Sequence, residues 1–375
     1  MRETRWNSIA SSIKLAIRKG ELLPGARIAS EIEMASQWNV STMTVHRALS
    51  ELQREGWVVR RRKAGTVIAD RSAQPLTKIG LVFTGLSDLP QRGYLNGIEE
   101  AFDKGYKLVV LNSDSKGPEE AACLQKAAEE CSAVICYPTG SLENTPLLKK
   151  IAAAMPLVFV DRIPEGIGAD VVMTDNYGSM LSGLNHLHSQ GHSRIAYFME
   201  DQVNVSSVNE RYAAYIDFIS KVQTDQNPKK WVHVFPGSMP RNQYYDRIEA
   251  AIAELLSEPE STRITAVACQ QEVVMTTVLD ASVRLGISIP GELAVLTFDD
   301  APPRMQPLAH YVHRLVQHPV EMGRMAAKRV QLRLTNPDVM PQTMRLTTDL
   351  FPASVHELSP VAQAFLASRH PKQTT

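Results

Sequence analysis

The sequence predicts an α/β protein in which a body of two lobes, each a doubly wound parallel sheet, follows an N-terminal winged helix-turn-helix domain. After about residue 77, apolar strands alternate with helices, an order typical of parallel sheets covered on both faces. Before that point the order is helix, helix, helix and hairpin. A chain of 375 residues exceeds one ordinary hydrophobic core. We therefore expect the winged helix-turn-helix domain at 1–71, a linker at 72–77, a two-lobed domain at 78–356 and a tail at 357–375.

The first two helices are predicted from apolar spacing and from capping residues. Apolar residues recur at helical spacing between residues 6 and 17, and this helix is expected to stop near Gly20. Ser30 is a typical N-cap residue, and the glutamates that follow it suit the first turn of a second helix. Asn39 is expected to end that helix.

A third helix is predicted to begin after Ser41 and to end at Gly56. Two strands at 57–61 and 65–69, joined by a tight turn, complete the domain as a β-wing. The helix has apolar residues at positions i, i+3, i+4 and i+7, which places them on one face: Val45, Ala48, Leu49 and Leu52.

Positive charge is concentrated in this N-terminal domain. Residues 1–71 contain 13 lysines and arginines against 7 acidic residues, and the rest of the chain contains 27 against 33, so the formal net charge is zero. A basic domain on an acidic body indicates a polyanionic partner for that domain. DNA fits, because its major groove accepts a helix and its phosphates attract lysine and arginine. A solvated turn is the alternative for the cations at 60–63.

The residues expected to contact double-stranded DNA lie at the start of the third helix and on the wing. Small polar residues at the start of such a helix allow the backbone to approach the duplex, and a cationic hairpin can reach phosphates or the minor groove. The predicted set is Ser41, Thr42, Met43, Thr44, His46, Arg47, Arg60, Arg61, Arg62, Lys63, Gly65 and Thr66.

The body is expected to alternate strands and helices along its whole length. Its first strand is predicted at 78–84 and its first helix at 91–105. Further strands are predicted at 107–113, 133–139, 157–162, 170–176, 194–200, 231–237, 264–270 and 293–300, with helices at 118–130, at 146–154 and from residue 176 to about residue 191.

The stretch 21–69 contains a Pro-Gly turn, the pattern "VS..TV..AL..L..EG" and a Gly-Thr wing. In these features it resembles the winged-helix head of the gluconate-repressor (GntR) family, with Ala29 where the family has proline. Many members carry arginines where this sequence has Ile32, Thr42 and His46. The resemblance implies a DNA-binding head in which Arg47 and the wing take a larger share of the contacts.

Seven motifs follow in order over about residues 78–355: "KIGLVFTGLSD", "GYLNGIEEAF", "PLVFVDR", "TDNYGSMLSGLNHLHSQGHSRIAYF", "ERYAAY", "LAVLTFDD" and "QHPVEMG". Together they resemble the effector domain of the lactose-repressor (LacI/GalR) family, which has a periplasmic-binding-protein-like fold. A winged-helix head on such a body resembles the arabinose-repressor type of hybrid regulator.

The second resemblance implies that an effector binds between the lobes. Arg211 and Asp299 fall on ligand-binding positions of the family, and Gln270 stands with Gln271 where many relatives have an acidic residue. The full effector-binding set implied in this way is Asp88, Gln91, Asp161, Arg162, Arg211, Gln270 and Asp299.

The combined expectation is a cytoplasmic transcription regulator, a repressor of carbohydrate genes rather than an enzyme. It is expected to bind operator DNA as a homodimer that pairs through the body, and to respond to a sugar or sugar derivative. No membrane association is expected, because the sequence lacks a long apolar run and a signal-peptide pattern. No cofactor or metal is expected: the cysteines lack paired spacing, and His188 and His192 suit helix packing better than a metal site.

Two other classes of protein remain compatible with the sequence. Some winged heads of this type are joined to pyridoxal-phosphate aminotransferase-like bodies, although no lysine here stands out as a Schiff-base residue. A cytosolic solute-binding protein is the second alternative.

Overall fold

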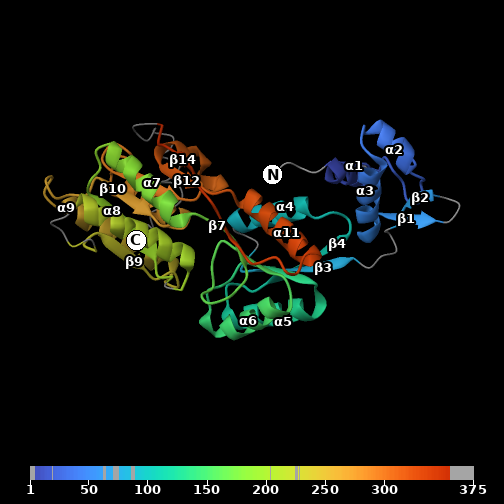
Figure 1. Cartoon of the computed structure of the whole chain (residues 1–375). Coiled ribbons are helices and arrows are strands. Elements are labelled where there is room, and N and C mark those ends of the chain that lie inside the picture. Colours follow the sequence, from blue (N-terminus) through green and yellow to red (C-terminus); the bar gives the residue numbers. More distant parts are fainter. Residues whose placement is uncertain are drawn as a thin grey trace. The chain divides into compact units, whose positions relative to one another are not determined.

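The computed structural model of the chain describes residues 5–18, 20–61, 65–70, 76–85, 89–202, 204–223, 227 and 229–354. Most of the predicted linker, the predicted tail, and the side chains of Arg62, Lys63 and Asp88 lie outside the described residues. The chain forms two compact units (Figure 1): Met1–Thr77 with Phe102–Lys107, and Lys78–Ala101 with Leu108–Thr375. The helices and hairpin of the first unit are called the head, and the second unit is called the body.

The head has the predicted order of elements. Ser30 caps α2 through a capping box, in which its hydroxyl accepts the N–H of Glu33 and the Glu33 carboxylate accepts the N–H of Ser30 at 2.7 Å. Asn39 has a left-handed φ of 49°, which ends the chain's helical path before α3. The elements are α1 (Arg5–Arg18), α2 (Glu31–Gln37), α3 (Thr42–Arg54), β1 (Val58–Arg61) and β2 (Gly65–Ile68).

The core of the head is built on the apolar face of α3. The four residues of its predicted stripe are fully buried, together with residues of α1 and of the hairpin. β1 and β2 pair in antiparallel fashion, with Val58 opposite Ile68 and Arg61 opposite Gly65. The helix-turn-helix and wing predicted from the sequence are therefore confirmed.

The first lobe of the body contains a six-stranded sheet of order β13-β7-β6-β5-β3-β4. The pairings of β13 with β7, β7 with β6, β6 with β5 and β5 with β3 are all parallel. Its strands are β3 (Thr77–Phe83), β4 (Tyr106–Asn112), β5 (Ala133–Cys136), β6 (Leu157–Val160), β7 (Asp170–Thr174) and β13 (Thr343–Leu346), and its helices are α4 (Leu89–Ala101), α5 (Gly117–Glu130), α6 (Thr145–Ala154) and α11 (Pro319–Thr335).

The second lobe repeats this arrangement with the order β14-β12-β11-β10-β8-β9. All of its strand pairs are parallel except the edge pair of β12 and β14, which is antiparallel. Its strands are β8 (Ile195–Glu200), β9 (Val232–Phe235), β10 (Ala266–Cys269), β11 (Ala294–Phe298), β12 (His313–Val316) and β14 (Asp349–Phe351), and its helices are α7 (Asn176–Ser189), α8 (Ser206–Val222), α9 (Arg241–Ser257) and α10 (Glu272–Arg284).

The chain passes between the lobes three times. It leaves the first lobe after β7, returns after β12 to form α11 and β13, and crosses again to form β14. The predicted strands of the body are all present, and the two-lobed α/β fold is confirmed. Four elements near the end of the body, β12, α11, β13 and β14, were not placed by the sequence pattern.

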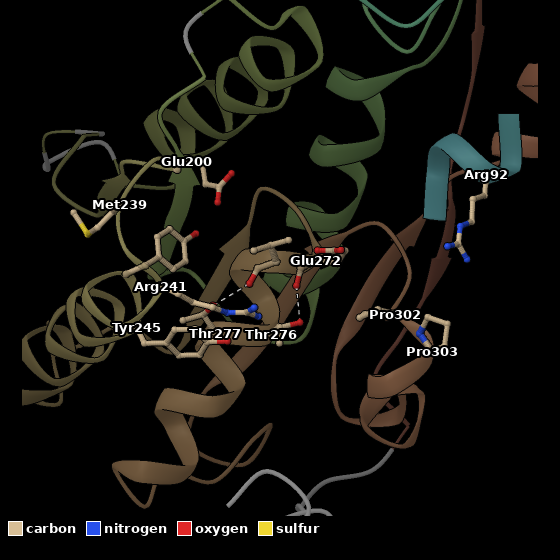
Figure 2. Close-up of a pocket in the computed structure, with 13 residues that line it drawn as sticks. Arg92, Glu200, Met239, Arg241, Tyr245, Glu272, Thr276, Thr277, Pro302 and Pro303 are labelled. Carbon is tan, nitrogen blue, oxygen red and sulfur yellow. Dashed lines mark hydrogen bonds between the residues drawn. The ribbon is translucent and has the colours of Figure 1, made fainter. Parts of the chain in front are cut away.

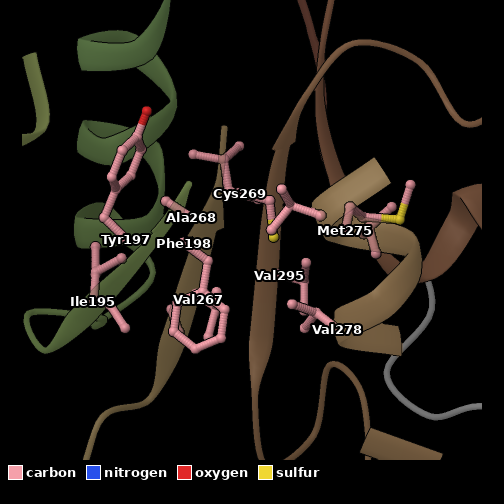
Figure 3. Close-up of a cluster of buried hydrophobic side chains, with 14 of the residues drawn as sticks. Ile195, Tyr197, Phe198, Val267, Ala268, Cys269, Met275, Val278 and Val295 are labelled. Atoms are coloured by element: carbon pink, nitrogen blue, oxygen red, sulfur yellow. The ribbon is translucent and has the colours of Figure 1, made fainter. Parts of the chain in front are cut away.

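The core of the second lobe lies against the central strand β10 (Figure 3). The side chains of β8, β10, β11 and α10 that meet there are almost completely buried: Ile195, Tyr197, Phe198, Val267, Ala268, Cys269, Val295, Met275 and Val278. These packed strands hold the loops at their carboxyl ends in place. Among the described residues, no helix is long and apolar enough to cross a membrane.

Candidate ligand site and nucleic-acid interface

A pocket of about 280 Å³ lies at the carboxyl ends of the parallel strands of the body. Open α/β sheets usually bind ligands at this edge. The residues that line it come from both lobes and include Thr84, Gln91, Tyr137, Asp161, Arg162, Gln202, Ser207, Arg211, Gln271, Asp299 and Gln317.

Arg211 is held rigidly in this pocket. It lies in the second turn of α8, and only 4% of it is exposed. Its Cζ lies 3.6 Å from the ring centroid of Phe298. Its Nε donates to Oδ1 of Asn176 at 2.8 Å, and its Nη1 donates to the carbonyl of Gln270 at 2.9 Å. These two hydrogen bonds and the Phe298 ring fix the guanidinium in the lining of the pocket.

Asp299 is the first residue after β11 and faces the same pocket. Its φ of 78° is left-handed, a conformation that aspartate adopts more readily than most residues. Its Oδ1 accepts a hydrogen bond from Nε2 of Gln317. Burial raises the pKa of this carboxyl above its usual range, and the positive charge of Arg211 partly opposes that rise.

Asp161 and Arg162 form the first-lobe side of the pocket. Asp161 is 5% exposed, and its Oδ1 accepts the hydroxyl proton of Tyr94 at 3.1 Å. Its Oδ2 lies 3.5 Å from Oγ of Ser207 in the second lobe. The guanidinium of Arg162 stacks 4.4 Å from the ring centroid of Tyr137. A hydrogen-bonded carboxylate and an arginine therefore stand on each side of the pocket.

The side chains of two predicted effector residues, Gln91 and Gln270, are engaged in hydrogen bonds within the protein. The side chain of Gln270 does not line the pocket: it is fully buried, and its Oε1 accepts the N–H of Glu200 at 2.6 Å. This corrects its predicted role as a ligand contact, since it acts through the carbonyl that holds Arg211. Gln91 does line the pocket. Its Nε2 donates to the hydroxyl of Thr84 and its Oε1 accepts the N–H of Gly85, so this side chain shapes the loop after β3.

Several pocket residues were missed by sequence reasoning, among them Tyr137, Ser207 and Gln317. Tyr137 and Gln317 each follow directly after a parallel strand, as Asp161 and Asp299 do. Gln317 also lies in the second crossing between the lobes, where its Oε1 accepts the hydroxyl proton of Thr174, the last residue of β7 before the first crossing. A predicted strand that ended at Cys136, rather than one spanning 133–139, would have pointed to Tyr137, whereas the strand before Gln317 was not predicted and Ser207 lies in α8.

The pocket has the chemistry of a site for a polyhydroxylated ligand. An ionised carboxylate accepts hydrogen bonds and a guanidinium donates them, so together they satisfy a hydroxyl group that does both. Among the described residues, no group of three or more histidine, cysteine, aspartate or glutamate side chains is arranged to hold a metal ion.

A second, larger pocket of about 660 Å³ adjoins the first and is lined by residues of the second lobe together with Arg92 of α4 (Figure 2). The two pockets share Glu272 and Val273 in their linings. Glu200 of the second pocket accepts hydrogen bonds from Gln202 at 3.0 Å and Gln271 at 2.8 Å, both of which line the first. Figure 2 shows Arg92 on a separate helix, apart from the other labelled side chains. The converging arginines and carboxylates favour the smaller pocket as the ligand site.

The exposed face of α3 carries four of the predicted DNA contacts: Thr42, Met43, His46 and Arg47. Met43 is 73% exposed, and His46 and Arg47 are also exposed. Arg47 stacks 4.8 Å from the ring centroid of Trp6. Ser41 and Thr44 are engaged in the cap of the helix, since the Ser41 hydroxyl accepts the N–H of Thr44 at 3.2 Å.

The wing arginine Arg60 is bound within the head. Its Nη2 donates to Oε1 of Glu31 at 2.8 Å, and Nδ1 of His46 lies 3.1 Å from the same oxygen. Arg61 is exposed at the end of β1, and Gly65 opens β2 with a φ of 76°. The predicted wing cations thus differ in setting: Arg60 bridges the wing to the helices, and Arg61 faces solvent.

Residues 6–68 match the family model "Bacterial regulatory proteins, gntR family", and residues 184–352 match "Periplasmic binding protein-like domain". The chain is 27% identical to the arabinose metabolism transcriptional repressor of Halalkalibacterium halodurans, over 88% of each chain. The structure of the transcription regulator CcpA of Lactococcus lactis aligns with a TM-score of 0.64 at 16% identity, over 75% of this chain and 100% of that one. The CelR–cellobiose complex aligns with a TM-score of 0.61 at 21% identity, over 84% and 92%.

Proposed function

We propose that this chain, a transcription regulator that joins a winged-helix domain of the gntR family to a periplasmic binding protein-like domain, represses carbohydrate-utilisation genes under the control of a sugar. The similarity to an arabinose metabolism transcriptional repressor over most of both chains supports this role. Because such relatives are regulators, the enzyme alternative is set aside.

The convergence of Asp161, Arg211 and Asp299 on one small pocket carries the proposal. These side chains supply acceptors and donors for sugar hydroxyls, and the ring of Tyr137 offers an apolar surface. The pocket volume of about 280 Å³ lies just below the range of about 300–1,000 Å³ for drug-sized ligands, and so favours a small saccharide. The neighbouring fold of CelR, solved with cellobiose, supports a sugar as the ligand class.

A sugar bound in this pocket would join the two lobes. It would contact Asp161 in the first lobe and Arg211 and Asp299 in the second. A ligand shifts a conformational equilibrium by its difference in affinity for the two states, so it would favour the closed body. We propose that this closure alters the affinity of the head for double-stranded operator DNA. We further propose that the protein is cytoplasmic and acts as a homodimer on paired half-sites.

Thermal-shift and DNA-retardation measurements on the full-length protein test the proposal together. In a panel of arabinose, galactose, ribose and cellobiose, one sugar at about 100 times its dissociation constant should stabilise the protein by roughly 2.7 kcal/mol. The same sugar should change retardation of promoter DNA upstream of carbohydrate genes. A protein that binds sugar but retards no DNA would be a solute-binding protein, and this result would overturn the proposal.

A further inference from the structure

Two large apolar side chains of the head are largely exposed at the starts of α2 and α3. Ile32, the second residue of α2, is 75% exposed, and Met43, the second residue of α3, is 73% exposed. Among the large hydrophobic residues that the structure describes, only Met340 reaches a similar exposure, at 76%. Single exposed apolar residues are common on protein surfaces. These two differ because they lie in the first turns of both helices of the helix-turn-helix.

The contacts of Glu31 place the start of α2 beside the exposed face of α3. The Glu31 carboxylate lies 3.1 Å from Nδ1 of His46, and Ile32 is the next residue of α2. Met43 precedes His46 by three positions and Arg47 by four, so all three lie on one face of α3. Met43 therefore shares its surface with His46 and Arg47, and Ile32 is an exposed apolar residue in the turn of α2 that Glu31 joins to this surface.

The major groove of DNA offers one apolar group to such side chains. Its base edges are hydrogen-bond donors and acceptors except for the C5-methyl group of thymine, which is read by apolar contact. Isoleucine and methionine have no side-chain donor for guanine, whereas an arginine binds guanine with two hydrogen bonds. The exposed cations Arg47 and Arg61 lie on the same domain and suit the flanking phosphates.

We propose that Ile32 and Met43 read thymine by packing against its C5-methyl group, so that each operator half-site carries thymine at the two positions that they contact. This inference rests on the proposed DNA-binding function of the head and specifies the sequence class of its partner. The preference for guanine that an arginine would give at the position of Ile32 is replaced by a preference for thymine.

Deoxyuridine substitution isolates the methyl group, because it removes only that group and preserves base pairing. In vitro selection with the full-length protein first yields a binding sequence, and each of its thymines is then replaced singly by deoxyuridine. At the contacted thymines the affinity of the wild-type protein should fall about fourfold, the effect of one buried methyl-sized group. The variants Met43→Ala and Ile32→Ala should each become insensitive to the substitution at one of those positions.

Leu15→Ala is the matched control, since Leu15 is 50% exposed on α1 and should leave the whole deoxyuridine profile unchanged. Selection with Ile32→Arg should enrich guanine in place of thymine at one position. Wild-type affinity that is unaffected by deoxyuridine at every position, or equal losses in wild type and variants, would overturn the inference. Failure of the wild type to select any sequence would instead contradict the DNA-binding function itself.

Discussion

Asp161 and Asp299 occupy equivalent positions in the two lobes. Each is the first residue after the third strand in its sheet order, β6 in one lobe and β11 in the other. Their φ angles of 70° and 78° are both left-handed, and both side chains line the same pocket. Backbone strain of this kind costs on the order of 1–3 kcal/mol for most residues and clusters at ligand sites. The same left-handed turn after a strand therefore brings one carboxylate to the pocket from each lobe.

Replacing either carboxylate by an amide should weaken sugar binding without unfolding the protein. Asparagine also tolerates the left-handed conformation, so Asp161→Asn and Asp299→Asn keep the loop geometry. Loss of a charged hydrogen bond in a closed site costs about 1.5–3 kcal/mol, a decrease in affinity of about 10- to 150-fold. Calorimetry with the stabilising sugar measures this, and retardation of sugar-free protein on DNA should stay unchanged. Wild-type sugar affinity in both variants would exclude the pocket as the effector site.

Removing Arg211 should destabilise the body as well as the ligand site. In Arg211→Met, the Oδ1 of Asn176 and the carbonyl of Gln270 lose their buried donor, at a cost of roughly 2–4 kcal/mol. Arg345→Met is the matched control, because Arg345 pairs with Glu210 near the surface at 2.8 Å and its loss should cost less than about 1 kcal/mol. Urea unfolding of the two variants compares them directly. Equal stabilities would show that the Arg211 hydrogen bonds contribute little.

Regular patterns made most of the fold predictable from the sequence. The interior strands of the body are continuous apolar runs and are buried along their length, as in β5, β6 and β10. The edge strands β13 and β14 are short and partly exposed, so they have no such run and were missed. The crossings that bring α11 back to the first lobe depend on long-range pairing, which no local pattern encodes. The predicted domain boundaries remain predictions.

The candidate site was less predictable than the fold. Asp161 and Asp299 were implied by the resemblance to the lactose-repressor family, and in the structure each directly follows a parallel strand that ends at the pocket. Gln270 also follows a strand, but its side chain turns back to the N–H of Glu200, and its neighbour Gln271 lines the pocket instead. Which of the two glutamine side chains lines the pocket depends on where the fold places a buried donor such as the N–H of Glu200. The pairing of Arg60 with Glu31 likewise joins residues 29 positions apart.

The two described wing arginines should affect DNA binding differently. Arg61 is exposed, and Arg61→Ala should flatten the slope of log affinity against log salt by about 0.9 if it makes one phosphate contact. Arg60→Ala should leave the salt slope nearly unchanged, because Arg60 is paired with Glu31. It should still lower the affinity for the selected operator, because the bridge from the wing through Glu31 to His46 is lost. Binding isotherms at four salt concentrations test both. Equal flattening by the two variants would make Arg60 a phosphate contact as well.

Acid should destabilise the body through His313. This residue is 7% exposed, and its Nδ1 accepts the N–H of Ala353 at 3.2 Å, an arrangement that a proton on Nδ1 would break. Burial, with a smaller effect from His186 and His192, lowers the pKa of His313 to about 4. The unfolded chain, with an ordinary histidine pKa of about 6.5, then binds more protons than the folded one, so stability is complete above that pH and declines as pH falls toward 4.

The expected loss is on the order of 1–2 kcal/mol between pH 7.5 and pH 5. His313→Gln retains an acceptor for the N–H of Ala353 and cannot titrate, so its stability should depend less on pH over this interval. His188→Gln, at an exposed position of α7, is the control and should follow the wild-type pH dependence. Urea midpoints at the two pH values provide the measurement. If His313→Gln lost as much stability in acid as wild type, protonation of His313 would not be the cause.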